Sequence, residues 1–272
     1  MKVVILCGGK GTRLREETEY RPKPLVGIGG KPILWHIMKM YSAYGFRDFV
    51  LCLGYKGEMI KDYFINYDLL NSDFTIELGS KRITRDNVAH DEADWRVSLV
   101  DTGLETMTGG RLSAVRKYVQ SDDAFMVTYG DGVSDVNITN LLDFHRRSGR
   151  TATLTGVHPV GRFGELALEG DAVRLFAEKP ASTDRWINGG FFVMSPKIFD
   201  YIDGENCTFE HEPLEQLSRE DQLGVYRHPG YWQCMDNPKD MDLLNNEWAS
   251  GSAPWKVWSE SNESELPRLL AA

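Results

Sequence analysis

The chain has 272 residues, of which 42% are hydrophobic and 26% charged, and its formal net charge is −9. This size fits one large globular domain with a short appendage, whose core needs neither disulfides nor metals to fold. The acidic balance argues against general binding to nucleic acid or to an anionic membrane surface. The four cysteines show no zinc or redox spacing, and no apolar run suits a signal peptide or a membrane span, so we expect a cytoplasmic protein.

In the first half of the chain, strand-like and helix-like segments alternate, which predicts βαβ units and a mainly parallel sheet. The predicted strands span residues 3–6, 49–53, 75–78, 97–100 and 124–129, and the predicted helices span 32–44, 57–67 and 108–119. Residues 81–94 are polar and charged. We expect them to form an exposed excursion that carries the subunit contacts of a homo-oligomer.

The second half is less regular, with a β-hairpin predicted around residues 170–171. Its predicted strands span 151–158, 165–169, 172–177, 190–194, 225–228 and 231–235, and its predicted helices span 196–202, 211–220 and 238–248. No repeat or low-complexity linker divides the chain, so we predict a single domain over residues 1–258. The tail at 259–272 is expected to fray or to pack against a neighbouring subunit.

A glycine-rich loop directly follows the first predicted strand, with the sequence Cys7-Gly8-Gly9-Lys10-Gly11-Thr12-Arg13-Leu14. Glycines let the backbone turn tightly and approach a ligand closely, and their N–H groups can converge on an anion. Thr12 adds a hydroxyl group, and Arg13 adds a guanidinium fork that suits phosphate oxygens. Further on, Lys23 stands between two prolines, which stiffen its backbone. Together these features predict a loop that grips polyphosphate and a lysine aimed at it.

Two better-known phosphate loops do not fit this sequence. In the P-loop a serine or threonine follows the Gly-Lys pair, whereas Pro32 follows Gly30-Lys31 here. In the dinucleotide fingerprint the last position is glycine, whereas Leu14 fills it here. An ordinary strand-to-helix turn would explain the glycines alone, but it leaves Thr12, Arg13 and the Pro-Lys-Pro segment unexplained.

A second glycine-flanked segment, Gly130-Asp131-Gly132, follows the strand predicted at 124–129. Open parallel sheets bind ligands beyond the carboxyl ends of their strands, so this segment and the glycine loop are expected to face one crevice. An aspartate in such a place can hold Mg²⁺, which takes one or two carboxylates and completes its coordination with water and phosphate oxygens. The alternative for Gly-Asp-Gly alone is a simple turn.

The glycine loop and Pro-Lys-Pro-Leu together resemble the nucleotide-binding opening of the sugar-nucleotide pyrophosphorylases, or nucleotidylyltransferases. Within that family the overall likeness is greatest to the glucose-1-phosphate cytidylyltransferases. Other segments that resemble the family are 29–38, 54–57, 106–111, 129–132, 178–180, 188–192 and 232–236. The resemblance covers residues 1–258 and implies an α/β fold. That fold has a Rossmann-like, mostly parallel mixed sheet flanked by helices, as in glycosyltransferase-A folds, and a small β-rich sugar-binding portion.

The resemblance also implies a reaction and a set of site residues. A sugar phosphate, glucose 1-phosphate, would attack the α-phosphorus of CTP with the help of Mg²⁺, and Arg13, Lys23 and Asp131 would be catalytic. The nucleotide would contact Leu6, Cys7, Gly8, Gly9, Lys10, Gly11, Thr12, Arg13, Lys23, Thr106, Arg111 and Gly130. The sugar phosphate would contact Glu178, Lys179, Asn188 and Gly189, and Asp131 and Asp236 would hold the metal. The nucleotide-binding part would cover about residues 1–135, and the sugar-phosphate-binding part about 136–258.

Three alternatives remain open at this point. The first is a uridylyl- or thymidylyltransferase of the same fold, and the second is a non-catalytic sensor of nucleotide sugars. The third is a glycosyltransferase that holds its metal with Asp240-Met241-Asp242, although that segment is expected to be the solvated face of a helix. His36 and Trp232 are interpreted as core residues.

Overall fold

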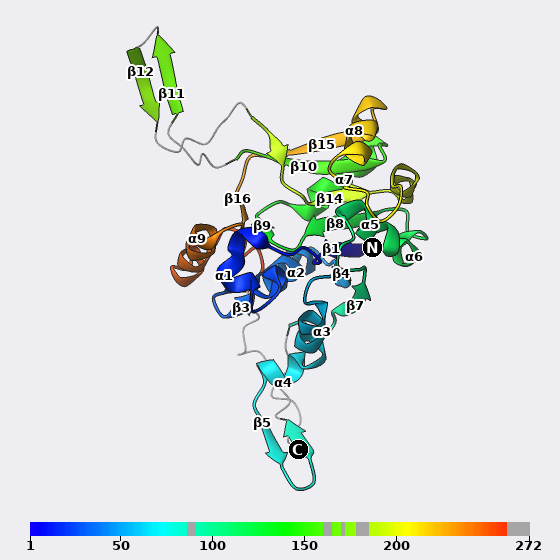
Figure 1. The fold of residues 1–272 in the computed structure, drawn as a ribbon, viewed down its shortest axis with the longest axis vertical. Helices are drawn as coiled ribbons and strands as arrows, with labels where there is room; N and C mark the ends of the chain where they lie inside the picture. Colours follow the sequence, from blue (N-terminus) through cyan, green and yellow to red (C-terminus); the bar gives the residue numbers. More distant parts are fainter. Residues whose placement is uncertain (86–90, 160–164, 170–171, 178–184, 260–272) are drawn as a thin grey trace, which may run out of the picture.

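The computed structural model describes residues 1–85, 91–159, 165–169, 172–177 and 185–259. One mixed eight-stranded sheet lies at its centre, in the order β13-β10-β14-β8-β1-β4-β7, with β15 paired to β10 (Figure 1). The first four strands of this sheet along the chain are β1 (Lys2–Leu6), β4 (Asp48–Leu53), β7 (Arg96–Asp101) and β8 (Phe125–Tyr129). The other four are β10 (Ala152–Val157), β13 (Ile187–Asn188), β14 (Phe192–Met194) and β15 (Leu223–His228).

The strands from the first half of the chain form a parallel block. β1 runs parallel to both β4 and β8, and β4 runs parallel to β7. β14 and β10 then continue the sheet in antiparallel pairs, which makes it mixed. The predicted α/β fold with a mostly parallel sheet is therefore confirmed, and the carboxyl ends of β1 and β8 meet at one edge.

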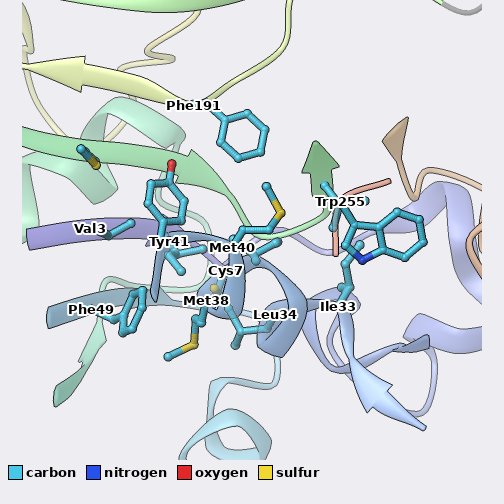
Figure 2. Packing of buried hydrophobic residues seen from close by; sticks show 14 of the residues in the cluster. Val3, Cys7, Ile33, Leu34, Met38, Met40, Tyr41, Phe49, Phe191 and Trp255 are labelled. Atoms are coloured by element: carbon cyan, nitrogen blue, oxygen red, sulfur yellow. The ribbon is translucent and has the colours of Figure 1, made fainter. Parts of the chain in front are cut away.

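Successive residues of β1 face two separate hydrophobic cores. Val3 and Ile5 belong to one core, and Val4 belongs to the other, as the two-residue period of a strand requires. A strand buried on both faces reads as a continuous apolar run, which explains Val3-Val4-Ile5-Leu6. Figure 2 shows side chains from residues 33–41 packed against Val3 and Phe49 in the first core.

Helices cover both faces of the sheet (Figure 1). The longer ones are α2 (Ile33–Ala43), α3 (Gly57–Ile65), α7 (Ile138–Ser148), α8 (Glu212–Arg219) and α9 (Pro238–Ala249). The shorter ones are α1 (Arg15–Thr18), α4 (Tyr67–Asn71), α5 (Thr108–Ala114) and α6 (Arg116–Val119), with 3₁₀ turns η1 (Thr12–Leu14), η2 (Lys23–Leu25) and η3 (Pro196–Tyr201). Along the described ranges, no helix is both long and apolar enough to cross a membrane.

Within the described ranges, four small two-stranded ladders accompany the main sheet. They are β2 (Gly27–Ile28) with β3 (Lys31–Pro32), β5 (Phe74–Glu77) with β6 (Arg82–Arg85), β9 (Gly132–Ser134) with β16 (Trp232–Cys234), and β11 (Glu165–Glu169) with β12 (Ala172–Ala177). The predicted hairpin at 165–177 is confirmed. The predicted excursion at 81–94 contains β6, which forms a hairpin with β5 that extends away from the body of the protein (Figure 1).

Several predicted helices differ from the observed ones. The helix predicted at 57–67 ends at Ile65, and α4 begins at Tyr67. The helix predicted at 108–119 is interrupted at Val115, whose ψ of 5° is not helical. The segment predicted as a helix at 196–202 is the 3₁₀ turn η3. Helix α7 was not predicted.

His36 is a core residue, as the sequence indicates. Its imidazole is fully buried, with Nε2 2.9 Å from the Ile28 carbonyl oxygen, and Trp255 Nε1 donates to Nδ1 at 3.3 Å. Trp248 and Trp258 lie against the same ring. The segment that follows α9 therefore packs onto α2 and closes the first core.

Candidate active site

A cavity of about 440 Å³ opens at the carboxyl ends of β1 and β8. This is where an open sheet with parallel strands is expected to bind its ligand. Its lining contains Leu6, Cys7, Gly8, Gly9, Gly11, Thr12, Arg13, Lys23, Pro24, Thr106, Met107, Thr108, Arg111, Tyr129, Gly130, Asp131 and Asp236. Most residues that the sequence predicts to contact the nucleotide therefore lie together around one cavity.

The glycine loop turns at Gly11, which has φ 61° in the left-handed region. A Cβ there would lie 2.7 Å from Thr18 Cγ2, so both the dihedral angle and the available space require glycine. The Gly11 carbonyl accepts hydrogen bonds from Leu14 N and Thr18 Oγ1, which closes the turn. Within the described part of the chain, the N–H groups of residues 8–13 donate to no other protein group. They suit an anion.

Arg111 joins two walls of the cavity. Its guanidinium group is buried and donates to the carbonyl oxygens of Gly8, Leu53 and Gly103, at 2.8 to 3.1 Å. A Cβ on Gly8 would lie 2.1 Å from Arg111 Nη1, so the loop can approach this group only because residue 8 is glycine. The sequence predicts that Arg111 contacts the nucleotide. The structure adds that it fixes the glycine loop to the segment that follows β7.

Four charged side chains meet at one side of the cavity. Lys23 Nζ lies 2.6 Å from Asp131 Oδ2 and 2.8 Å from Asp236 Oδ1, and Arg13 Nη1 lies 2.6 Å from Asp236 Oδ2. The structure thus brings together all four residues to which the sequence assigns catalysis or metal binding. The Lys23 side chain is mostly buried, whereas that of Arg13 is exposed.

The β9–β16 ladder brings the two aspartates together, although they are far apart in sequence. Asp131 precedes β9 and Asp236 follows β16, and Gly132 pairs with Cys234. Met235 N also donates to the Asp131 carbonyl oxygen at 2.9 Å. The backbone therefore holds the two carboxylates side by side.

Burial and charge act in opposite directions on Lys23. Burial alone would lower the pKa of Lys23, but Asp131 and Asp236 outweigh it, so this pKa is raised and the ammonium group stays charged. Nearby, burial and then the charge of Asp236 raise the pKa of Cys234 to about 12. Burial also raises the pKa of Cys7. Both thiols are thus kept neutral, as expected of structural cysteines rather than nucleophiles.

Other predicted site residues lie at the edge of the cavity or outside the described ranges. Lys10 is not part of the cavity lining and forms an exposed ion pair with Glu105 at 2.7 Å. Asn188 Nδ2 donates to Tyr129 Oη at 3.3 Å, which places it next to a lining residue. The Gly189 carbonyl accepts from Trp232 Nε1 at 2.8 Å. Glu178 and Lys179 fall outside the described residues.

Several residues of this site are not among those predicted from the sequence. Pro24, Met107, Thr108 and Tyr129 line the cavity, and Glu210, which is not part of the lining, is bonded to Thr108 and Tyr129. Each lining residue lies inside or directly beside a motif quoted for the family, which is the signal that was available. Glu210 has no such signal, because it reaches its partners across 81 and 102 residues of sequence.

The Asp240-Met241-Asp242 segment has a structural role. The Asp240 carboxylate accepts from Asp236 N and Asn237 N, and Asn237 caps Asp240 in return, which completes a capping box at the start of α9. Asp242 is exposed. The expectation that these residues form a solvated helix face is right for Asp242, whereas Asp240 caps the helix and positions Asp236.

The donor set at Asp131 and Asp236 suits a divalent cation such as Mg²⁺. Two carboxylate oxygens converge within 3 Å of one cationic nitrogen, Lys23 Nζ. Across the residues that the structure describes, no cluster of three or more metal-ligating side chains is found. Mg²⁺ usually takes one or two carboxylates and completes its octahedron with water and substrate phosphate, so two aspartates beside a phosphate loop fit it.

The glycine loop, the paired aspartates and the sheet together define a nucleotidyl transferase. Residues 2–240 match the nucleotidyl transferase family, and the chain belongs to that family. A glucose-1-phosphate cytidylyltransferase of Salmonella typhi is 52% identical over 259 residues, which cover 95% of this chain and 100% of the relative. A probable glucose-1-phosphate cytidylyltransferase of Bacillus subtilis (strain 168) is 45% identical over 260 residues, with the same coverage.

Solved structures agree with the fold. HddC from Yersinia pseudotuberculosis superimposes with a TM-score of 0.67 at 23% identity, covering 91% of this chain and 99% of that chain. Apo UDP-glucose pyrophosphorylase superimposes with a TM-score of 0.65 at 15% identity, covering 92% and 98%. At these identities the likeness shows the fold alone.

Proposed function

We propose that the chain transfers a cytidylyl group from CTP to glucose 1-phosphate, which yields CDP-glucose and pyrophosphate. The observation that carries this proposal is the cluster of Lys23, Asp131, Asp236 and Arg13 beside the glycine loop. The choice of CTP and glucose 1-phosphate rests on the full-length likeness to glucose-1-phosphate cytidylyltransferases.

The reaction is an in-line displacement at the α-phosphorus of the triphosphate. A phosphate oxygen of glucose 1-phosphate forms the new P–O bond, and the bond to the leaving pyrophosphate breaks. The nucleophile is already an anion at neutral pH, so no general base is needed, and catalysis consists of alignment and charge neutralisation. This explains a site made of cations, carboxylates and free N–H groups.

Each charged residue has a place in this scheme. The N–H groups of residues 8–13 and the Arg13 guanidinium group would bind the β- and γ-phosphates. Lys23 would neutralise charge on the α-phosphate. Asp131 and Asp236 would hold Mg²⁺, which when bound neutralises charge on the phosphates of both substrates.

The remaining predicted contacts complete the proposal. Gly8 and the segment from Thr106 to Arg111 would contact the cytosine base. Asn188 and Gly189 would contact the sugar phosphate, together with Lys179 on the phosphate and Glu178 on the sugar hydroxyls. A non-catalytic sensor of the same fold is disfavoured, because such a protein has no need of the Lys23–Asp131–Asp236 arrangement.

We also propose that the enzyme works as a cytoplasmic homo-oligomer. The β5–β6 hairpin exposes Phe74, Ile76 and Ile83 by 40% or more, which suits a surface covered by another subunit. Size-exclusion chromatography with light scattering would measure the subunit number, and a monomer at all concentrations would contradict this part of the proposal.

Pyrophosphate release is the measurement that tests the proposed reaction. The protein is supplied with Mg²⁺ and glucose 1-phosphate, and with CTP, UTP, dTTP, ATP or GTP in separate reactions. We expect release with CTP, loss of most of it in Lys23→Ala, and full release in the control Lys117→Ala, whose lysine is exposed on α6. Release with only UTP or dTTP would show that the enzyme is a uridylyl- or thymidylyltransferase. No release from folded protein would favour the non-catalytic sensor of nucleotide sugars.

A further inference from the structure

A hydrogen-bonded cluster centred on Glu210 joins Thr108 and Tyr129 of the cavity lining to Asn188. Glu210 Oε1 accepts from Tyr129 Oη at 2.7 Å, and Oε2 accepts from Thr108 Oγ1 at 2.6 Å. Tyr129 Oη also receives a bond from Asn188 Nδ2 at 3.3 Å. Tyr129 and Thr108 both line the cavity, whereas Glu210 is not part of the lining.

The segment that carries Glu210 is firmly attached to this wall. Met107 N donates to the Glu205 carbonyl at 3.0 Å, and Gly109 N donates to the Cys207 carbonyl at 2.9 Å. Phe209 N donates to Thr108 Oγ1 at 2.9 Å. The residues directly before Glu210 are therefore bonded to the segment that carries Thr108, which places the Glu210 carboxylate next to its two hydroxyl partners.

The direction of these hydrogen bonds decides what Tyr129 can offer a ligand. A carboxylate only accepts, so the phenolic proton of Tyr129 must point at Glu210. Asn188 Nδ2 can only donate, so it takes a lone pair of the same oxygen. A tyrosine phenol ordinarily keeps its proton at neutral pH, since its usual pKa is about 10. Beyond these two bonds, Tyr129 Oη is left with acceptor capacity alone.

We propose that Tyr129 accepts a hydrogen bond from a hydroxyl group of the bound substrate, and that Glu210 is the positioning residue that fixes this acceptor role. A sugar hydroxyl and the cytosine amino group can both donate to this oxygen, whereas a phosphate oxygen has no proton to give. The bond from Asn188, which the proposed function places beside the sugar phosphate, favours a sugar hydroxyl. Both the hexose of glucose 1-phosphate and the ribose of CTP carry such groups. This inference rests on the proposed function.

A second tyrosine–glutamate pair with the same hydrogen-bond distance provides a control. Tyr201 Oη donates to Glu220 Oε2 at 2.7 Å, the same distance as in the Tyr129–Glu210 pair. Tyr201 lies outside the lining of the active-site cavity. Tyr201→Phe therefore removes an equivalent tyrosine–carboxylate bond without removing a group that faces the substrate.

The test compares substrates that lack single hydroxyl groups. The kcat/KM of wild type and of Tyr129→Phe is measured with glucose 1-phosphate and with its 2-, 3-, 4- and 6-deoxy analogues. It is also measured with CTP against 2′-deoxy-CTP and 3′-deoxy-CTP. We expect Tyr129→Phe to lower kcat/KM about two- to tenfold for the complete substrates, which is the effect of one neutral hydrogen bond. For the one analogue that lacks the recognised hydroxyl, wild type and variant should be equal.

The identity of that analogue separates the two sources of the hydroxyl. A deoxyglucose 1-phosphate would assign it to the hexose, and a deoxy-CTP would assign it to the ribose. Equal losses with every analogue would show a merely structural role for Tyr129 and overturn the inference. An inactive wild type would instead overturn the proposed function, and this inference with it.

Glu210→Gln tests the positioning role. Glutamine has one acceptor oxygen where glutamate has two, so one of the two hydroxyls must change its direction. We expect Glu210→Gln to lower kcat/KM with the same dependence on the analogue, and the double variant with Tyr129→Phe to be non-additive. Tyr201→Phe should leave kcat/KM within twofold of wild type. Additive losses would contradict a shared role for Glu210 and Tyr129.

Discussion

Among single residues, Gly8 and Gly9 differ in what surrounds them, although they are neighbours in one loop. A Cβ on Gly8 would lie 2.1 Å from Arg111 Nη1, whereas a Cβ on Gly9 would have no atom within 4 Å. Arg111 cannot move aside freely, because its guanidinium group is buried and bonded to several backbone carbonyls. The two positions therefore separate the packing role of the loop from its ligand-binding role.

We predict that Gly8→Ala lowers the free energy of unfolding by about 1–3 kcal/mol, which is the usual cost of overpacking a filled site. Gly9→Ala should leave it within about 0.5 kcal/mol of wild type. Urea titration followed by circular dichroism measures both. Equal stabilities of the two variants would show that Arg111 adjusts without cost and would contradict the proposed role of Gly8.

The residues that could be predicted are those whose chemistry is local in sequence. The prolines around Lys23 and the glycines around Asp131 are enough to predict that these two residues belong to a binding site. Asp236 was predicted from the family resemblance. Arg111 was predicted to contact the ligand, but its hydrogen bonds to Gly8 and Gly103 depend on how distant segments pack. Glu210 was missed for the same reason.

Among the helices and strands, α2 and the segment after α9 are in contact around a titratable side chain, that of His36. Burial, the largest cause, and the charge of Lys31 lower the pKa of His36 from 6.5 to about 4, although the bond to the Ile28 carbonyl acts in the opposite direction. With Nε2 donating to Ile28, Nδ1 is left to accept from Trp255. A proton on Nδ1 would face the Trp255 N–H group and remove that bond.

We predict that stability falls as the pH is lowered from 6.5 to about 4. In this window the unfolded chain binds a proton on His36 and the folded chain does not, so protonation favours unfolding. The free energy of unfolding falls by about 3 kcal/mol in total once the pH is below about 4, and protonation of His36 costs no stability above pH 6.5. Urea titrations at several pH values measure it.

His36→Gln should reduce this dependence on pH, whatever its effect on stability at pH 7. The exposed His211, replaced by Gln, is the control and should leave the dependence unchanged. His145, whose pKa burial also lowers, stays present in both variants. If the dependence in His36→Gln matched that of wild type, other groups would account for the pH effect.

Elements were predictable where a buried face runs through the whole segment, as in β1, β4 and α2. Helix α7 was not predicted, although its buried residues Ile138, Leu141, Leu142 and His145 have the i, i+3, i+4, i+7 spacing of an amphipathic helix. Two short elements near the start of the chain are a different case. η1 and α1 are too short for a helical period to show, because one turn holds 3.6 residues.

In the molecule as a whole, the site depends on segments from both ends of the chain. The glycine loop and Lys23 come from the first residues, and Asp236 comes from the connection between β16 and α9. The β9–β16 ladder and the packing of α9 beside β2 join these parts. Folding of the C-terminal segment is therefore coupled to assembly of the site.

The boundary of the folded domain can be tested by truncation. Trp255 is fully buried in the first core, and Ala253, Val257 and Trp258 pack against that core. We predict that a chain ending at residue 259 unfolds at the same urea concentration as the full chain. A chain ending at residue 252 should lose more than about 3 kcal/mol, because removal of one buried tryptophan side chain alone costs about that much.

The matched variant Trp255→Ala in the full chain separates packing from chain length. It should reproduce most of the loss seen on truncation at residue 252, and it should lower pyrophosphate release to the extent that it unfolds the protein. Reduced stability of the chain ending at residue 259 would move the boundary into the tail at 259–272. Unchanged stability of the chain ending at residue 252 would show that the C-terminal segment does not close the first core.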